Sequence, residues 1–446
     1  MKLKYIGWLC LALMLLGFSM PSIAAGQLWR LDNGLEVLVI EDHRAPVVLC
    51  SVWYRVGPVN EHNGMTGISH FLEHMMFLGT KRFPGDDFAH QIEKVGGMSN
   101  AFTSSDLTVY YEELPKNYLS LALDLESDRM QNLSLSPDLF EIEKNVVKEE
   151  RRMRVSDNPV GSSVEKLRAA TFMNSPYQHP VVGWMTDIDA LNIDDVKHWY
   201  DHWYAPNNAV LVIVGDVSVK EVRPLVKRYF SQVPEKKVPI SKPRQPIGFV
   251  GKQQLVLHHP AVKTKMVIQY FSAPQIVKEG GNAQVYALIL LDAMLTGDNG
   301  SRLDKAWVQD GRWADEVGGS YWPFHFYPTI LSLSLVLPQS TNLSKAQESL
   351  DHLKFYLQKH PFTEKELSRA KTKVIAQAIY KSDTLMGLAS QMAYPLIFSG
   401  HLISNAMFSE KIQSVTLSQV QEIEQQIFSV NASSSLWLLP QNMEAK

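Results

Sequence analysis

Cysteine is nearly absent from this chain of 446 residues, which has only Cys10 and Cys50. Cys10 lies in an N-terminal segment that we expect to be removed, so Cys50 would be the only thiol of the mature protein and no disulfide could form within the chain. A protein that is exported without disulfides has to be stabilised by its hydrophobic core.

Blocks of basic residues are also absent, because 43 lysines and arginines are balanced by 46 acidic residues for a net charge of −3. This near-neutral balance argues against a nucleic acid as the partner. Hydrophobic residues make up 45% of the sequence. A chain of this length and composition can form two domains with substantial cores.

The N-terminus has the pattern of a secretory signal peptide, which we assign to residues 1–25. Two lysines precede an apolar run from about Tyr5 to Met20, and small residues follow at Ser22, Ala24 and Ala25. We expect cleavage after Ala24 or Ala25, and an uncleaved anchor is the alternative, although the run is short for a membrane span. Cleavage would leave no stable span, and export without disulfides fits the bacterial periplasm.

The predicted elements occur in the same order twice along the chain. The first half begins with strands up to Val56, continues with helices and ends with a buried strand at 207–217. After a Pro- and Lys-rich linker at 234–246, QQLVLHHPAVKTKMVIQYF looks like the early strands and SSSLWLLPQ like the closing strand. We therefore expect an α+β fold with two similar domains, at 26–233 and 247–446. Each would be a mixed, mostly antiparallel sheet with helices packed on one face, and chance similarity of two α+β domains is the alternative.

The segment GISHFLEHMMFLGT, residues 67–80, carries two histidines and a glutamate in an otherwise apolar predicted helix. At 3.6 residues per turn, His70, Glu73 and His74 fall on one narrow stripe of that helix. Burying ionisable groups without a partner is costly, so either other side chains or a cation must satisfy them.

Two histidines at i and i+4 can chelate one metal ion, and the glutamate before the second histidine can act on a metal-bound water. This is the H-x-x-E-H pattern of inverzincins. Imidazole and carboxylate ligands without a cysteine cluster predict a catalytic zinc site, with one ion per chain. A pair of core histidines held by Glu73 is the structural alternative.

Only the first half carries this polar stripe. Aligning Gly79 with Gly297 places Leu288, Leu291 and Asp292 at the three corresponding positions. An internal repeat in which one copy carries the chemistry suggests an active domain and a supporting or substrate-gripping domain.

A third metal ligand is required, and spacing alone does not name it. Glu143 and Glu150 in LFEIEKNVVKEERRMR (139–154) are seven residues apart and share a helix face with Val147. As an isolated feature, a helix so rich in charge is usually a solvated surface. On this reasoning either glutamate is a candidate.

The chain resembles the pitrilysin-like M16 zinc peptidases, and among them the half-length members similar to mitochondrial processing peptidase and its bacterial relatives. The resemblance extends over nearly all of the mature chain and is carried by HFLEH, GGMSNAFTSSDLTVYY, EKNVVKEERRM, YAPNNAVLVIVGD and, in the second half, GSRL. It implies His70, His74 and Glu150 as zinc ligands and Glu73 as the general base. It also implies that Glu143 supports the metal site from outside the ligand set.

The resemblance further implies how a substrate would bind. SNAFT, residues 99–103, looks like the family's edge strand, to which a peptide adds through main-chain hydrogen bonds. Asn100 and Ala101 are therefore expected to contact the substrate, and an ordinary turn and strand is the alternative.

One position pair departs from the family pattern. In many relatives the second half carries an arginine and a tyrosine that hold the substrate and stabilise the oxyanion, whereas alignment on GSRL places Val308 and Asp315 there. Neither side chain can donate the hydrogen bonds that an oxyanion needs. Some bacterial relatives work as pairs in which the sister chain has the arginine and tyrosine. We therefore expect a heterodimer with a sister M16-like subunit, with a homodimer as the alternative.

These expectations describe a secreted zinc endopeptidase that hydrolyses peptides or unfolded segments in a chamber formed by two such chains. Glu73 would take a proton from zinc-bound water and return it to the leaving amine. One alternative is a noncatalytic structural subunit of the same fold, although such subunits tend to lose the motif that this chain keeps. Another is a metal-binding module without turnover.

The aromatic segment SYWPFHFYP, residues 320–328, is expected to line the core or the cleft.

Overall fold

The structure is a computed structural model that describes residues 26–240, 249, 251–277, 282–429 and 432–441. The predicted signal peptide and residues 241–246 of the predicted linker lie outside the described residues. The first part of that linker, residues 234–240, forms neither helix nor strand. Within the described part of the chain, no helix is long and apolar enough to cross a membrane.

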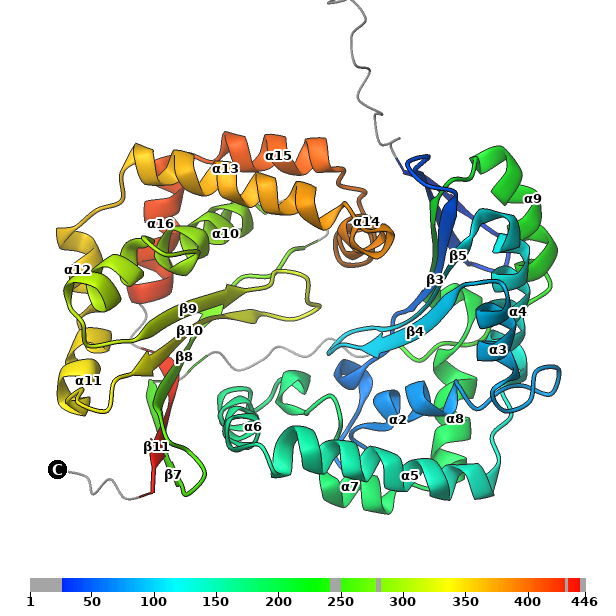
Figure 1. Ribbon diagram of the computed structural model, residues 1–446, viewed down its shortest axis with the longest axis horizontal. Helices are drawn as coiled ribbons and strands as arrows, with labels where there is room; N and C mark the ends of the chain where they lie inside the picture. The colour runs from blue at the N-terminus through cyan, green and yellow to red at the C-terminus, as the bar shows by residue number, and fades with distance from the viewer. Residues whose placement is uncertain (1–25, 241–248, 250, 278–281, 430–431, 442–446) are drawn as a thin grey trace, which may run out of the picture.

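Two mixed sheets with the same topology form the frame of the molecule (Figure 1). Their strand orders are β1-β2-β6-β3-β5-β4 and β7-β11-β8-β10-β9. The pairs β2–β6 and β7–β11 are parallel, and the other pairs are antiparallel. Apart from the additional β1, each sheet therefore arranges its strands in the same way, which confirms the expected α+β fold with two similar domains.

The first sheet consists of β1 (Gln27–Arg30), β2 (Glu36–Glu41), β3 (Val47–Tyr54), β4 (Met98–Thr103), β5 (Thr108–Pro115) and β6 (Ala209–Gly215). The second sheet consists of β7 (Lys252–His259), β8 (Lys265–Ala273), β9 (Glu316–Tyr321), β10 (Thr329–Leu337) and β11 (Ser433–Pro440).

The helices of the first half are α2 (Ile68–Met75), α3 (Asp87–Lys94), α4 (Leu119–Asn132), α5 (Pro137–Arg151), α6 (Pro159–Thr171), α7 (Met185–Ala190), α8 (Ile193–Trp203) and α9 (Val219–Phe230). Those of the second half are α10 (Ala283–Thr296), α11 (Leu343–Asp351), α12 (Leu353–Lys359), α13 (Glu364–Lys381), α14 (Leu385–Ser399), α15 (Asn405–Ser414) and α16 (Leu417–Ser429). Short 3-10 or π segments are η1 (Pro58–Asn60), η2 (Lys116–Tyr118), η3 (Arg152–Ser156), η4 (Pro176–Gln178), η5 (Pro206–Asn208) and η6 (Asp304–Asp310).

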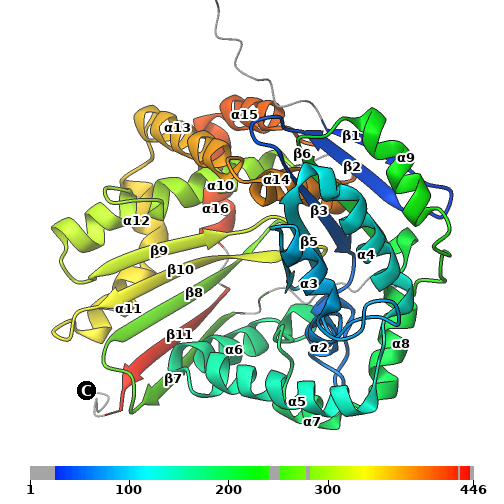
Figure 2. The same ribbon diagram turned by 45° about the vertical axis from the view of Figure 1, so that its right-hand side comes forward.

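Both faces of the first sheet are covered, each by a different half of the chain. Side chains alternate between the faces of a strand. In β3, Cys50 and Val52 face the core formed with α2, α4, α5, α8 and α9, whereas Leu49 and Trp53 pack with residues of α14. Because α14 belongs to the second half, the two halves are packed together around the first sheet (Figure 2).

The second sheet is covered in the reciprocal way. Its main core, which includes Val267 and Trp437, packs against α10 and α16. On its other face, Leu167 of α6 packs with Tyr270 and Leu436. Each half therefore contributes one helix to the far face of the other half's sheet, which the sequence did not predict.

Candidate metal centre

α2 carries two of the candidate ligands, His70 and His74, and is nearly enclosed. Its first turn follows Gly67, whose φ is +85°, a conformation that favours glycine. A Cβ atom at this position would lie 2.6 Å from the carbonyl oxygen of Val182, so only glycine fits without a shift. The apolar residues of the helix are fully buried, as the sequence pattern predicts: Ile68, Phe71, Leu72 and Met75.

Glu61 fixes the start of α2. Its buried carboxylate accepts hydrogen bonds from the backbone nitrogens of Gly67 at 2.7 Å and Ser69 at 2.9 Å. Such N–H groups have no partner within the helix, and a negative charge also interacts favourably with the N-terminal end of the helix dipole. Sequence reasoning did not find Glu61, because it lies in a loop and not in a recognisable capping pattern.

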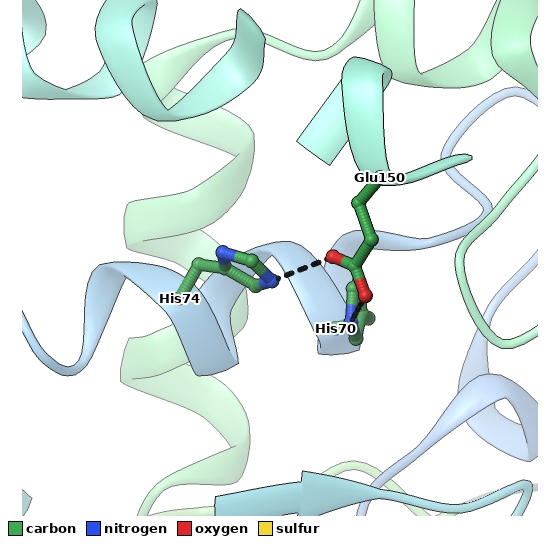
Figure 3. Close-up of side chains that lie close together, drawn as sticks. All are labelled: His70, His74 and Glu150. Carbon is green, nitrogen blue, oxygen red and sulfur yellow. Dashed lines mark ion pairs between the residues drawn. The ribbon is translucent and has the colours of Figure 1, made fainter. Parts of the chain in front are cut away.

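The structure brings His70, His74 and Glu150 together (Figure 3). Nε2 of His74 lies 3.1 Å from Oε2 of Glu150, and Nε2 of His70 lies 3.6 Å from Oε1. One ligand atom from each residue lies within 4.8 Å of the others. Two turns of α2 and the C-terminal end of α5 therefore converge on one point.

The arrangement of donor atoms fits a zinc ion. Two imidazole nitrogens and one carboxylate oxygen form the kind of three-residue ligand set that catalytic zinc sites use, with a further position left for water or substrate. Oε2 of Glu150 is buried and has no hydrogen-bond partner of good geometry among the described residues. Without a metal, only the ion pair with His74 compensates the charge of this buried oxygen, and a metal ion between the rings would take the place of the proton of His74.

Glu143 lies one layer behind the candidate ligands. Its Oε1 atom is 2.7 Å from Nδ1 of His74, which directs the other ring nitrogen, Nε2, toward Glu150. Val147, between the two glutamates in sequence, is fully buried. The seven-residue spacing thus places both carboxylates on the face of α5 that looks toward α2.

The two histidines have opposite protonation behaviour. Burial, together with the neighbouring His74, lowers the pKa of His70 to about 4. Burial also acts to lower the pKa of His74, but its contacts with Glu143 and Glu150 outweigh this and raise the pKa to about 9. At neutral pH the metal-free pair would therefore carry one positive charge, on a protonated His74, while His70 is neutral.

Glu73, the expected general base, lies on the same stripe of α2. Burial raises the pKa of its carboxyl group. The hydroxyl of Thr103, at the end of β4, donates a hydrogen bond to Oε2 of Glu73. The sequence analysis did not assign Thr103 a role, although it ends the SNAFT segment, because only the packing of β4 against α2 brings the two side chains into contact.

Arg154 is a second neighbour that the sequence analysis missed. Its Nη1 atom lies 2.7 Å from Oε1 of Glu150, and its side chain is largely exposed. The contact arises in η3, the π segment that continues α5. Arg154 therefore holds Oε1 of Glu150 from the solvent side. The other carboxylate oxygen, Oε2, lies next to His74.

β4 is an edge strand of the first sheet, as expected, since it pairs only with β5. Asn100 is exposed, and its Oδ1 atom accepts a hydrogen bond from the backbone nitrogen of Ala101 at 2.8 Å. A peptide that paired with the free edge through Ala101 would have to replace this bond. The end of this edge strand is next to α2, where Thr103 contacts Glu73.

The second half has the corresponding scaffold without the ligands. α10 and the edge strand β9 border a cavity of about 890 Å³. Asp292 lines it, accepts a hydrogen bond from Thr296 at 3.3 Å and has its pKa raised to about 6 by burial. In the described residues, the only cluster of metal-ligating side chains is the one in the first half.

Val308 packs against the core of the second half, and Asp315 is exposed.

Two domains of one topology, with an inverted zinc motif in the first alone, define a class of two-domain metallopeptidases. The chain belongs to peptidase family M16. The model described as Insulinase (Peptidase family M16) matches residues 36–183, and the model described as Peptidase M16 inactive domain matches residues 190–374. The second description agrees with the lack of a metal cluster among the described residues of that half.

Similar proteins are named as a zinc protease and as a subunit of a processing peptidase. Zinc protease PqqE from Helicobacter pylori is 27% identical over 419 residues, which cover 92% of both chains. The beta subunit of the mitochondrial-processing peptidase from Lentinula edodes is 24% identical over 413 residues, which cover 89% of this chain and 86% of that subunit.

Solved structures share the fold. A protease from Helicobacter pylori superposes with a TM-score of 0.86 at 25% identity and covers 94% of this chain and 100% of its own. The periplasmic protease PqqL from Escherichia coli superposes with a TM-score of 0.79 at 20% identity, over 94% of this chain and 48% of its own. The second likeness concerns the fold alone.

Proposed function

We propose that this chain is a secreted zinc endopeptidase that hydrolyses peptides or unfolded segments. The observation that carries the proposal is the convergence of His70, His74 and Glu150, with Glu73 on the same stripe of α2. The names of its relatives support the same chemistry. In this proposal the three converging residues hold one zinc ion per chain.

Zinc, when bound, supplies a Lewis acid that polarises a peptide carbonyl and makes a water molecule more acidic. Glu73 accepts the proton of the attacking water and passes it to the leaving amine. Burial raises the pKa of Glu73, which makes its carboxylate a stronger base. Thr103 holds Oε2, so the proton is taken up at Oε1. Glu143 keeps the imidazole of His74 oriented toward the ion.

The substrate binds as an additional strand on the free edge of β4, along Asn100 and Ala101. The supporting observation is that β4 pairs on one side only. Binding through main-chain hydrogen bonds does not depend on the side chains of the peptide, so we expect broad specificity for extended peptides.

The site is completed by a second subunit in the periplasm. Val308 and Asp315 cannot donate hydrogen bonds to an oxyanion, so we propose that a sister M16-like chain supplies these donors, with a homodimer as the alternative. As a signal peptide, residues 1–25 would direct export to the periplasm and would then be removed. Size-exclusion chromatography and co-purification distinguish the two assemblies, and a fully active monomer would rule out both.

The test of the proposed function compares wild type with Glu73→Gln. Zinc content is measured together with digestion of a peptide library read by mass spectrometry, with and without a candidate sister chain. We expect about one zinc ion in both proteins and turnover in wild type alone. Stoichiometric zinc without turnover in any combination would instead support a noncatalytic metal-binding subunit.

A matched pair tests the third ligand. Glu150→Gln should lose zinc, whereas Glu149→Gln should keep it, because the neighbouring Glu149 is exposed and pairs with Arg152 outside the site. Equal zinc content in the two variants would exclude Glu150 as a ligand.

A further inference from the structure

A buried contact joins the second half of the chain to the turn that ends β4. Asp106 lies in the turn between β4 and β5 and is only 2% exposed. Its Oδ2 atom is 2.7 Å from Nδ1 of His325, which lies 219 residues further along the chain in the loop between β9 and β10. Its Oδ1 atom accepts a hydrogen bond from the hydroxyl of Tyr177 at 2.7 Å.

Tyr177 links the same two segments a second time. While its hydroxyl donates to Asp106, it also accepts a hydrogen bond from the backbone nitrogen of Tyr327 at 3.2 Å. The ring of Tyr177 lies against those of His325 and Tyr327, with centroids 4.9 and 6.0 Å apart. A carboxylate is costly to bury unless donors surround it, and here the donors come from η4 and from the second half. The position of Asp106 therefore depends on how the second half is docked.

The turn that contains Asp106 connects it to the residue that holds Glu73. It is short and tightly bonded: the nitrogen of Ser104 donates to the carbonyl of Leu107 at 2.8 Å, and the nitrogen of Val59 donates to the carbonyl of Ser105 at 2.9 Å. Ser104 directly follows Thr103, whose hydroxyl holds the Glu73 carboxylate. A shift of the turn would therefore move both the end of β4 and the partner of Glu73.

The loop that carries His325 is held independently on its other side. Phe324 packs against Tyr394 of α14, with ring centroids 5.7 Å apart, and Tyr394 packs against Trp53 of the first sheet at 5.3 Å. Loss of the Asp106 contacts would thus leave the halves together, so the effect of Asp106 on the site can be separated from docking of the domains.

We propose that Asp106, held by Tyr177 and His325, is a positioning residue that fixes β4 and Thr103 relative to Glu73. The second half, which lacks a metal cluster among its described residues, would then set the geometry of the site in the first half. For its effect on hydrolysis, this inference rests on the proposed function. The aromatic segment 320–328 would act through this contact.

The test uses the full chain with His325→Phe, Asp106→Asn and the conservative variant His325→Asn. The side-chain amide of asparagine can donate at about the place of Nδ1, so His325→Asn should restore the contact. We expect kcat to fall by about tenfold or more in His325→Phe and Asp106→Asn, because small displacements of reacting groups are costly. Zinc content should be unchanged, cleavage of one peptide should spread over more positions, and His325→Asn should stay within about twofold of wild type.

A purely structural role predicts a different result. The melting temperature would fall while kcat per folded molecule and the cleavage positions stayed the same, and this outcome would overturn the proposal. If Asp106→Asn fails to fold, His325→Phe still tests the proposal, because this variant keeps the Asp106 carboxylate and its hydrogen bond from Tyr177.

Hydrogen exchange gives a readout that does not require hydrolysis. Amides of residues 98–107 should exchange about tenfold faster in His325→Phe than in wild type, while those of α4 keep their rates. Unchanged exchange in 98–107 would overturn the inference. If wild type binds zinc but cleaves nothing, the proposed function fails, and exchange still decides whether the second half positions β4.

Discussion

At the scale of single residues, His74 is the group whose surroundings have the clearest consequence for metal binding. Its pKa is about 9 because its contacts with Glu143 and Glu150 outweigh burial, while burial lowers that of His70 to about 4. A histidine binds zinc only in its neutral form. Zinc must therefore displace the proton of His74 at any pH between these two values.

We predict that zinc binding at pH 7.5 releases about one proton from this pair. Apparent affinity should rise about tenfold per pH unit up to about pH 9 and then level off, because above that value His74 is already neutral. Calorimetric titration of the metal-stripped protein in buffers of different ionisation enthalpy counts the protons. No proton release, together with an affinity that is constant from pH 7 to 9, would contradict the assigned protonation state.

Glu143 provides the second prediction at this scale. Glu143→Ala should weaken zinc binding by about 10- to 100-fold, because His74 loses the partner that orients its ring. Glu141→Ala, an exposed position on the same helix, is the matched control and should bind zinc as wild type does. Competition with a chromophoric chelator measures both affinities, and equal values would show that Glu143 does not support the site.

Some of these residues were predictable from the sequence and others were not, for a physical reason. His70, Glu73 and His74 lie on adjacent turns of one helix, so their spacing alone predicts a shared face. Glu150 could be selected from Glu143 only through the family resemblance. Thr103 and Asp106 act through contacts with residues that are remote in sequence, which local patterns cannot reveal.

At the scale of elements, the start of α2 depends on a single carboxylate. Glu61→Ala should destabilise the fold by about 2–3 kcal/mol, because two buried backbone N–H groups lose their acceptor. Glu61→Gln should fall between wild type and Glu61→Ala, since its amide keeps one accepting oxygen. Denaturant unfolding at pH 8 measures this order, and equal stability of all three proteins would exclude the capping role.

Element prediction succeeded where one pattern dominated. The buried strand expected at 207–217 appears as β6, and the segments likened to the early and closing strands of the second half form β7, β8 and β11. The roles of α6 and α14 were not predictable, because an apolar helix face does not specify which sheet it will cover.

At the scale of the whole molecule, the two halves depend on each other. A fragment of residues 26–240 would expose the face of the first sheet that α14 covers, including Leu49, Trp53 and Val212. We expect this fragment to aggregate or to bind a hydrophobic dye, and to unfold without a cooperative transition. A monomeric fragment with a sharp thermal transition would show that α14 is dispensable for the first half.

The repeated topology was predictable at this scale because both halves repeat the order of strands and helices in sequence. The interlocking of the halves was not, since it depends on contacts between elements that are far apart in the chain. The contact of Asp106 with His325 is a further example, and it connects the interlocked arrangement to the site.

The proposed function requires one zinc ion held by His70, His74 and Glu150. Anomalous diffraction at the zinc absorption edge, from crystals of a preparation that cleaves peptides, locates this ion independently of its assigned ligands. We expect one strong peak within about 2.0–2.2 Å of Nε2 of both histidines and of a carboxylate oxygen of Glu150. An active preparation with no peak at this point, or with its zinc bound elsewhere, would contradict this assignment.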